Sequence, residues 1–375
     1  METGKNQSYN RSKNNLLVLN YLRKNGSASA TTLAGALHLS NAALSSILKK
    51  LVLRELIKEN AKKSLKGKGR KQVNYTLNER SSLMALIDFQ YGRYYINLAD
   101  VKENVLVSEL FETNQYDEKT LENIIREIDR LLQLQEYKSI PLKRIVISVP
   151  GKVNIVEKEI HCPLLNHPAY QGKEWILSLE KHFPSAKIIL GSVLSLAMQG
   201  EVHYGLAKEK ETAILVSNEN IIWGSMAVDG KVFVGEEGYA GDFGAVPVMF
   251  DGKCAQLSTF ASVSALEKHF NFDNFDSLLK RFNEDGEAKK YILSTATMLG
   301  MLYSSIATLL NISTIILTGH SVKLGEEYIE AIRKPIENAD YKANLVISEL
   351  NKKAISLGAF YVGATSLIEE EAGAE

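Results

Sequence analysis

The residues best suited to chemistry in this chain are closely spaced cations rather than nucleophiles or metal ligands. Within the segment LKGKGRKQVNYTLN, glycines separate four basic side chains, Lys66, Lys68, Arg70 and Lys71. Glycines let a loop follow a groove without steric cost, while Lys and Arg neutralise phosphates or enter a narrow minor groove. A basic, glycine-rich stretch is equally typical of a solvated linker. Its neighbours in the sequence decide between these interpretations.

The distribution of charge along the chain favours the phosphate-binding interpretation. The 375 residues carry no net charge, yet residues 1–75 hold fifteen Lys and Arg against three acids. This segment therefore has a charge of +12, and the remaining residues have a charge of −12. A small basic unit on a larger acidic body predicts a polyanionic partner for the first part only.

The basic segment follows a pattern of three short helices. An apolar stripe that ends at Gly26 predicts the first helix, and SATTLAGALHLS predicts the second. Ser40 is a good N-cap for the third, NAALSSILKKLVLRELI, in which apolar residues at helical spacing from Leu44 to Leu51 predict a core-facing stripe. The opposite face has small and polar side chains, which can approach base edges closely. The predicted DNA-binding residues of this helix are Ser40, Asn41, Ala42, Ser45, Ser46 and Lys49.

The basic segment also lies between two predicted strands. Residues 57–60 predict the first strand, and QVNYTLN predicts the return strand, with Val73, Tyr75 and Leu77 on one face. Three helices followed by such a hairpin predict a winged helix-turn-helix, with the basic segment as the tip of the wing. We therefore expect double-stranded operator DNA as a partner and Lys66, Lys68, Arg70 and Lys71 as wing contacts.

After Arg80 the pattern changes to an alternation of strands and helices. Three strands follow one another, then a helix over residues 117–137, the buried strand RIVISVPGKV, and long helices over 286–310 and 322–336. This alternation predicts an α/β body with strand ends at a cleft. The two cysteines, Cys162 and Cys254, offer neither a disulfide framework nor a cysteine-rich metal site. The polar N-terminus and the lack of long apolar runs predict a cytoplasmic protein without a membrane partner.

Several motifs resemble a known family, the ROK family of sugar kinases and sugar-responsive repressors. They include NGSASATTLAGALHLSNAALSSILKKLVLRELIKE, GKGRK, SVPGKVN, LLNHPAYQG, VDGKVFVGEEGYAGDFGAVPV and SLGAFYVGATSLI. The resemblance covers nearly all of residues 12–370 and extends to the repressor branch, which includes the xylose and N-acetylglucosamine repressors. It implies a two-lobed, actin-like body of the ribonuclease H-like, sugar kinase type. In that branch a sugar binds between the lobes, changes the geometry of a dimer or tetramer, and releases operator DNA.

Some motif positions of the family are kept. Asp88 matches the aspartate of the first phosphate loop, and Pro150 and Gly151 match the turn beside the sugar. Asn166 matches a sugar-contacting asparagine, and Asp242 replaces the usual glutamate while still able to accept hydrogen bonds from hydroxyl groups. The resemblance thus implies Gly151, Asn166 and Asp242 as effector-binding residues.

Other motif positions are lost. Val193 stands where the family has its catalytic aspartate, and a valine cannot deprotonate a sugar hydroxyl. Both phosphate loops carry bulky residues, Tyr91 and Tyr94 in the first and Ile222 and Trp223 in the second, where small residues would cradle phosphate. We therefore expect no catalytic residues, no ATP and no other cofactor.

The zinc site of the family is also missing from the sequence. Ala245 stands at its histidine position, and only Cys254 remains of its cysteine cluster. One thiol cannot build a tetrahedral site. The sequence predicts no bound metal.

These observations predict a catalytically inactive DNA-binding regulator, a repressor of carbohydrate genes. Residues 1–80 form the winged helix-turn-helix, 81–200 the first lobe and 201–375 the second lobe, whose C-terminal helix returns to the first. A homodimer or homotetramer is expected because operator half-sites are symmetric.

Two alternatives remain open. The body either binds a small carbohydrate effector or binds no sugar and serves oligomerisation or protein docking. For an anionic effector, the candidates are His161, His167, Arg93 and Lys152. A third interpretation, an active sugar kinase, is disfavoured because the sequence lacks the catalytic base and both phosphate loops.

Overall fold

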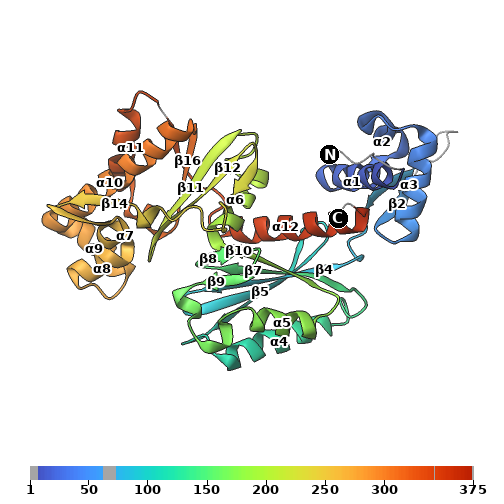
Figure 1. The fold of residues 1–375 in the computed structure, drawn as a ribbon, viewed down its shortest axis with the longest axis horizontal. Coiled ribbons are helices and arrows are strands. Elements are labelled where there is room, and N and C mark those ends of the chain that lie inside the picture. Colours follow the sequence, from blue (N-terminus) through green and yellow to red (C-terminus); the bar gives the residue numbers. More distant parts are fainter. Residues whose placement is uncertain (1–6, 62–72, 342, 374–375) are drawn as a thin grey trace.

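The computed structural model describes residues 7–61, 73–341 and 343–373. Figure 1 shows a small N-terminal head and two larger lobes, with the long helix α12 running from the region between the lobes to the head. Both marked chain ends lie at the head.

The head contains three helices and a three-stranded sheet, as predicted. Its elements are α1 (Gln7–Asn25), β1 (Ala28–Ser29), α2 (Ala30–Leu37), α3 (Asn41–Leu53), β2 (Ile57–Ala61) and β3 (Val73–Leu77). Strand β3 lies between β1 and β2 and is antiparallel to both, with Ile57 opposite Leu77. The first helix begins at Gln7, earlier than its apolar stripe indicated. The predicted winged helix-turn-helix fold is confirmed.

The first lobe is built on a five-stranded sheet. Its elements are β4 (Leu83–Gln90), β5 (Arg93–Asp100), β6 (Val105–Glu112), α4 (Glu118–Leu132), β7 (Leu142–Val149), β8 (Lys152–Asn154), β9 (Glu159–His161), α5 (Glu174–His182), β10 (Lys187–Ser192) and α6 (Val193–Tyr204). The strand order is β10-β7-β4-β5-β6. Strands β4, β5 and β6 are antiparallel neighbours, and β7 and β10 are parallel to β4. The predicted helix over residues 117–137 ends earlier, at Leu132.

The second lobe repeats this topology. Its elements are β11 (Thr212–Asn218), β12 (Ile222–Val228), β13 (Lys231–Phe233), β14 (Pro247–Phe250), β15 (Lys253–Gln256), α7 (Ser258–Ala261), α8 (Val263–Phe270), α9 (Phe275–Glu284), α10 (Gly286–Leu310), β16 (Thr314–Thr318), α11 (Glu326–Glu337), β17 (Asn344–Ile347) and α12 (Lys353–Ala372). The strand order is β13-β12-β11-β16-β17, which, read in reverse, matches the order β10-β7-β4-β5-β6 of the first lobe. Two such sheets in tandem are what the predicted actin-like body requires.

Helices α6 and α12 lie between the two sheets. Leu196 of α6 and Phe360 of α12 pack on the first sheet, while Met198 of α6 packs on the second. The two helices approach closely, because a Cβ built at Gly358 would lie 1.8 Å from the backbone oxygen of Leu196. Any movement of one helix must therefore involve the other.

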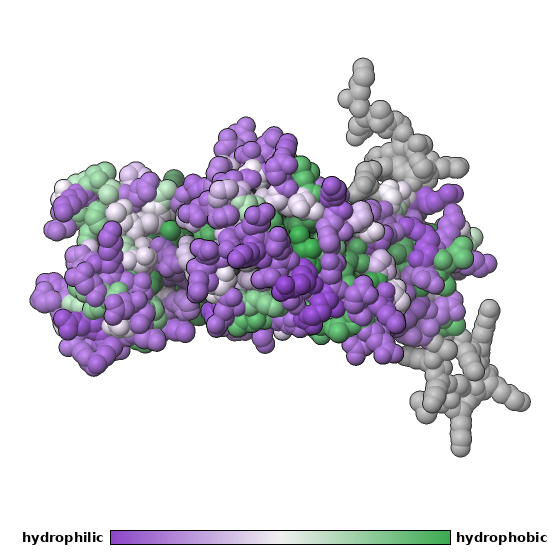
Figure 2. All heavy atoms as spheres, turned by 90° about the horizontal axis from the view of Figure 1, so that it is seen from below, coloured by the Kyte–Doolittle hydropathy of each residue, from purple (hydrophilic) through white to green (hydrophobic). Residues whose placement is uncertain are grey.

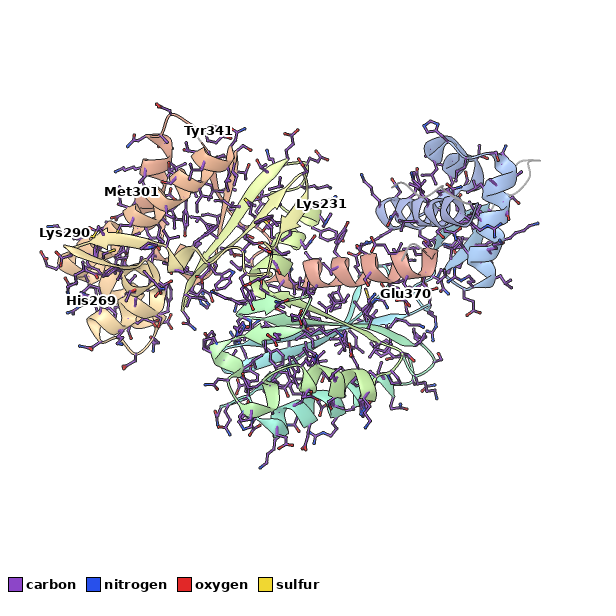
Figure 3. The ribbon with its side chains drawn as sticks, viewed as in Figure 1. Lys231, His269, Lys290, Met301, Tyr341 and Glu370 are labelled. Atoms are coloured by element: carbon purple, nitrogen blue, oxygen red, sulfur yellow. The ribbon has the colours of Figure 1, made fainter. Side chains whose placement is uncertain are left out.

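Helix α10 is apolar and long enough to cross a membrane by length and composition, the one such helix in the described part of the chain. Its Ile292, Leu299 and Tyr303 are buried in the core of the second lobe. Its outer face, where Figure 3 labels Lys290 and Met301, is exposed. Seen from below, the molecule is mostly hydrophilic, with apolar groups in scattered patches (Figure 2).

Candidate DNA-binding face and interlobe site

The predicted contact residues of α3 form one exposed face. Asn41, Ala42, Ser45, Ser46 and Lys49 are all exposed, while the stripe from Leu44 to Leu51 is buried in the head. The Ser40 hydroxyl caps the helix by accepting a hydrogen bond from the amide of Ala43 at 3.3 Å. The face therefore combines small side chains with a helix N-terminus, which favours approach to phosphates and base edges. The wing residues Lys66, Lys68, Arg70 and Lys71 lie outside the described residues.

A second feature of the head is its joint with α12, which the sequence did not predict. Leu367, Ile368 and Ala372 of α12 are buried in the same core as the helices of the head. The Arg54 guanidinium donates to the backbone oxygen of Glu371 at 2.6 Å and also pairs with its carboxylate. The head is thus packed on the end of α12.

Arg23 lies at the centre of this joint. Its guanidinium donates to Glu103 at 2.6 Å, to the Thr365 hydroxyl at 2.7 Å and to the Tyr361 backbone oxygen at 2.8 Å. It also lies 4.0 Å from the centroid of the Tyr361 ring, on which His203 stacks. Burial, assisted by the Arg23 charge, lowers the pKa of His203 to about 4. These groups are far apart in sequence, so no local pattern could have revealed the joint.

Helix α12 is also fixed to the first lobe. The buried Arg144 of β7 donates to Ser366 and pairs with Glu370 at 2.6 Å. Figure 3 labels Glu370 near the head end of α12. In the segment between β17 and α12, the Ser348 hydroxyl donates to Glu201 of α6, and α12 itself approaches α6 at Gly358. One helix therefore contacts the head, the first lobe and the helix that begins at the interlobe site.

A cavity of about 90 Å³ lies where strand ends of the two lobes meet. Its lining is contributed by the β4–β5 turn, the end of β7, the start of α6 and the β11–β12 turn. The lining residues are Tyr91, Pro150, Gly151, Ser192, Val193, Leu194, Ser217, Glu219, Asn220, Ile221 and Trp223. Tyr91, Val193 and Trp223 were each singled out in the sequence because they replace catalytic or phosphate-binding residues. The fold brings all three to one cavity.

The predicted effector-binding residues occupy different places. Gly151 lines the cavity, whereas Asn166 lines a neighbouring hollow that shares Tyr91 with it. Asp242 lines neither and pairs with Lys152 at 2.8 Å. The Lys152 ammonium also lies 5.8 Å from the centroid of Trp223. Gly151 and Asp242 are therefore neighbours through Lys152, and Asn166 stands apart from them.

The Lys152–Asp242 pair joins the two lobes. On one side is the β8–β9 hairpin, and on the other is the loop before Phe243. Gly238 of this loop has φ of 82°, and a Cβ there would lie 2.2 Å from the backbone oxygen of Val153. Only glycine allows such a close approach in this conformation.

Three of the remaining candidates, Asp88, His161 and His167, are held in other contacts. Asp88 is buried and accepts a hydrogen bond from Gln90 at 2.7 Å, and burial raises the pKa of its carboxyl group. His167 accepts a hydrogen bond from the amide of Ala169, and the His161 ring packs against Tyr239. Asp88 is not among the residues that line the cavity.

The residues at the family's zinc position do not fit a metal. Ala245 offers no ligand, Cys254 is an exposed thiol in β15, and no group of three His, Cys, Asp or Glu could hold a metal ion anywhere in the described ranges. Aromatic rings hold this region instead. Phe250 of β14 packs against Phe260 and Tyr291, with ring centroids 5.4 Å apart in both pairs.

Known proteins share this architecture along nearly the whole chain. The N-acetylglucosamine repressor of Escherichia coli O157:H7 is 24% identical over 378 residues, which cover 92% of this chain and 91% of that protein. The xylose repressor of Caldicellulosiruptor bescii is 22% identical over 377 residues, which cover 92% and 94%. A crystal structure of a ROK family transcriptional regulator, a homolog of the E. coli MLC protein, matches with a TM-score of 0.78 at 18% identity and covers 96% and 99%.

Family models match both parts of the chain. A winged helix-turn-helix DNA-binding model matches residues 11–58, which include most of α1 and all of α2 and α3. The ROK family model matches residues 87–371, which span both lobes and α12. This protein therefore belongs to the ROK family and carries a winged helix-turn-helix head.

Proposed function

We propose that this protein is a sequence-specific DNA-binding repressor of carbohydrate genes, released by a sugar or sugar derivative bound between the lobes. The observation that carries the proposal is the exposed, small-residue face of α3 in a basic head that is joined to a ROK body. The proposal includes a cytoplasmic location and a homodimer or homotetramer, because a two-fold assembly matches symmetric half-sites. It also includes functional units over residues 1–80, 81–200 and 201–375.

The body is proposed to be catalytically inactive. Val193 begins α6 at the edge of the cavity, and a side chain without a titratable group cannot accept a proton from a sugar hydroxyl. Incubation with ATP and a panel of sugars, including xylose and N-acetylglucosamine, should give no phosphoryl transfer. Turnover above that of a buffer control would contradict this.

The DNA-binding role is tested on operators selected from random duplexes by the full-length protein. The double variant Lys68→Ala/Arg70→Ala should weaken binding, and the slope of log affinity against log salt should fall by about 2, because each cation that contacts phosphate contributes about 1. Lys181→Ala/Lys280→Ala removes the same charge from exposed positions of the body and is the matched control. Equal slopes for the two double variants would remove the wing from the interface.

A second candidate function is a DNA-binding regulator whose body binds no sugar. The observation that favours it is the placement of Asn166 in a hollow separate from Gly151 and Asp242. A thermal-shift screen over sugars and sugar phosphates separates the two, since a ligand that binds the native state raises its apparent stability.

A further inference from the structure

The cavity between the lobes has the wrong chemistry for phosphate. Its lining is mostly apolar, with Val193, Leu194, Ile221 and Trp223 around it, and none of its lining residues is Lys, Arg or His. The single carboxylic acid in it, Glu219, accepts a hydrogen bond from the amide of His320 at 3.2 Å and lies 3.5 Å from the imidazole of that residue. A lining that contains this carboxylate and no Lys or Arg disfavours a phosphate group.

The same cavity is well suited to a small apolar group. Apolar walls favour the transfer of a hydrocarbon group from water, and a cavity of about 150 Å³ with such walls can hold benzene. At about 90 Å³ this cavity is smaller, so a chain of roughly three or four carbons would fill it. Ser192, Ser217 and Asn220 add a few hydrogen-bonding groups at its wall.

A polar site for the rest of the ligand adjoins the cavity. Gly151 belongs to the lining, and the next residue, Lys152, pairs with Asp242 beside Trp223. The ammonium group of Lys152 can donate hydrogen bonds to hydroxyl groups, and the carboxylate of Asp242 can accept them. Trp223 contacts both places, because its ring lies near Lys152 and also lines the cavity. A ligand with a polyhydroxyl part and an apolar substituent would match both neighbours.

We propose that the interlobe cavity binds a short alkyl substituent of a carbohydrate effector, so that the effector is a substituted sugar rather than a free sugar or a sugar phosphate. The carbohydrate part of this inference rests on the proposed function, and the apolar part rests on the cavity itself.

The test uses the full-length protein with Trp175→Phe, which leaves Trp223 as the single tryptophan. Trp175 is buried, and its indole N–H has no hydrogen-bond partner, so phenylalanine removes no hydrogen bond. The probes are xylose and N-acetylglucosamine, their methyl, propyl and butyl β-glycosides, and 1-butanol as a sugar-free probe. Binding is followed by the emission of Trp223.

Affinity should rise about fourfold per methylene from methyl to propyl, which corresponds to burial of about 0.8 kcal/mol per CH₂. It should level off once the cavity is full, and 1-butanol should compete with the butyl glycosides. Parent sugars that bind as tightly as their glycosides would overturn this inference and leave the proposed function standing. If 1-butanol binds but none of the glycosides does, the proposal of a carbohydrate effector is overturned. The DNA-binding role is tested separately by operator binding.

Variants at Val193 test whether the alkyl substituent binds in this cavity. Val193→Asp should abolish the gain per methylene, because a carboxylate beside the alkyl chain must be desolvated. The variant should fold, since Val193 is the first residue of α6 and an acid is favourable at a helix N-terminus. Val193→Thr keeps the shape of the side chain and should lose less of the gain in affinity per methylene. Val156→Asp, at an exposed position of the first lobe, should show the same gain as wild type. An unchanged gain per methylene in Val193→Asp would overturn the assignment to this cavity.

Discussion

At the scale of single residues, small changes of side chain decide what each site can do. Val193, at the start of α6, has no titratable group and is one of the apolar residues that line the cavity, while Asp242 pairs with Lys152 across the lobes. On the head, the hydroxyl of Ser40 caps the N-terminus of α3 by accepting a hydrogen bond from the amide of Ala43. Such roles can be separated by substitutions that keep one property and change another.

Ser40 offers such a separation. Ser40→Ala should lower the free energy of unfolding by about 1 kcal/mol, because the amide of Ala43 loses its cap. Ser40→Asp should keep the stability, since aspartate also caps, but should weaken DNA binding by placing a negative charge on the recognition face. Denaturant unfolding and fluorescence anisotropy with operator DNA measure the two effects. Ser45→Ala, at an exposed position without a capping role, is the control for stability. Equal losses of stability in Ser40→Ala and Ser40→Asp would contradict the capping role.

At the scale of elements, α12 connects the parts of the molecule. It packs against α6 and the first sheet, and its last turn enters the core of the head. Helix α6 begins with Val193 at the cavity, so the cavity and the head lie at opposite ends of one pair of packed helices. The glycine at position 358 is one of the places that let the two helices approach closely.

Gly358→Ala tests that contact. Alanine is a better helix former than glycine by about 1 kcal/mol, but its Cβ would overlap the backbone oxygen of Leu196. The net effect should be a loss of about 1–3 kcal/mol in the free energy of unfolding, as for other overpacked cores. Gly35→Ala in α2 is the matched control, because a Cβ added there would meet no neighbouring atom within 4 Å, and it should stabilise the protein. Stabilisation by Gly358→Ala would show that the two helices have room to separate.

At the scale of the whole molecule, the joint between head and body sets how the DNA-binding face is presented. Arg23 and Glu103 are 10% and 8% exposed, so removing the arginine leaves a nearly buried acid without its cation. Arg23→Ala should reduce stability by about 3 kcal/mol and increase amide exchange in α1 and in the last turns of α12. Lys24→Ala changes the same charge at an exposed neighbouring position and should do neither. Equal exchange in both variants would mean that the head docks without Arg23.

The joint should also weaken in mild acid. His203 has its pKa lowered from 6.5 to about 4, so the unfolded chain takes up the proton at a higher pH than the folded chain. The stability from neutral His203 is complete above pH 6.5 and is lost as the pH falls towards 4. His203→Phe keeps the stacking on Tyr361 and should show a flatter fall over this window in denaturant unfolding. Parallel curves for wild type and His203→Phe would contradict this.

Local patterns in the sequence were enough for the elements of the head and the alternation of the body. The apolar stripe from Leu44 to Leu51, the cap at Ser40 and the alternating return strand depend on neighbours a few residues away. Motif positions that had lost their family residues, such as Val193, were also visible without a structure. The DNA-binding and effector residues assigned from these patterns stay predictions until binding is measured.

Long-range contacts needed the tertiary structure. Arg23 meets Thr365 across 342 residues of sequence, and the lining of the cavity comes from four separate segments. Spacing along the chain carries no information about such pairs, because they depend on how two sheets and α12 pack. The sequence alone predicted the main elements and the loss of the catalytic groups that the family resemblance implies. Only the fold decided that three of the replacements, Tyr91, Val193 and Trp223, line one mostly apolar cavity and that its helix leads to the DNA-binding head.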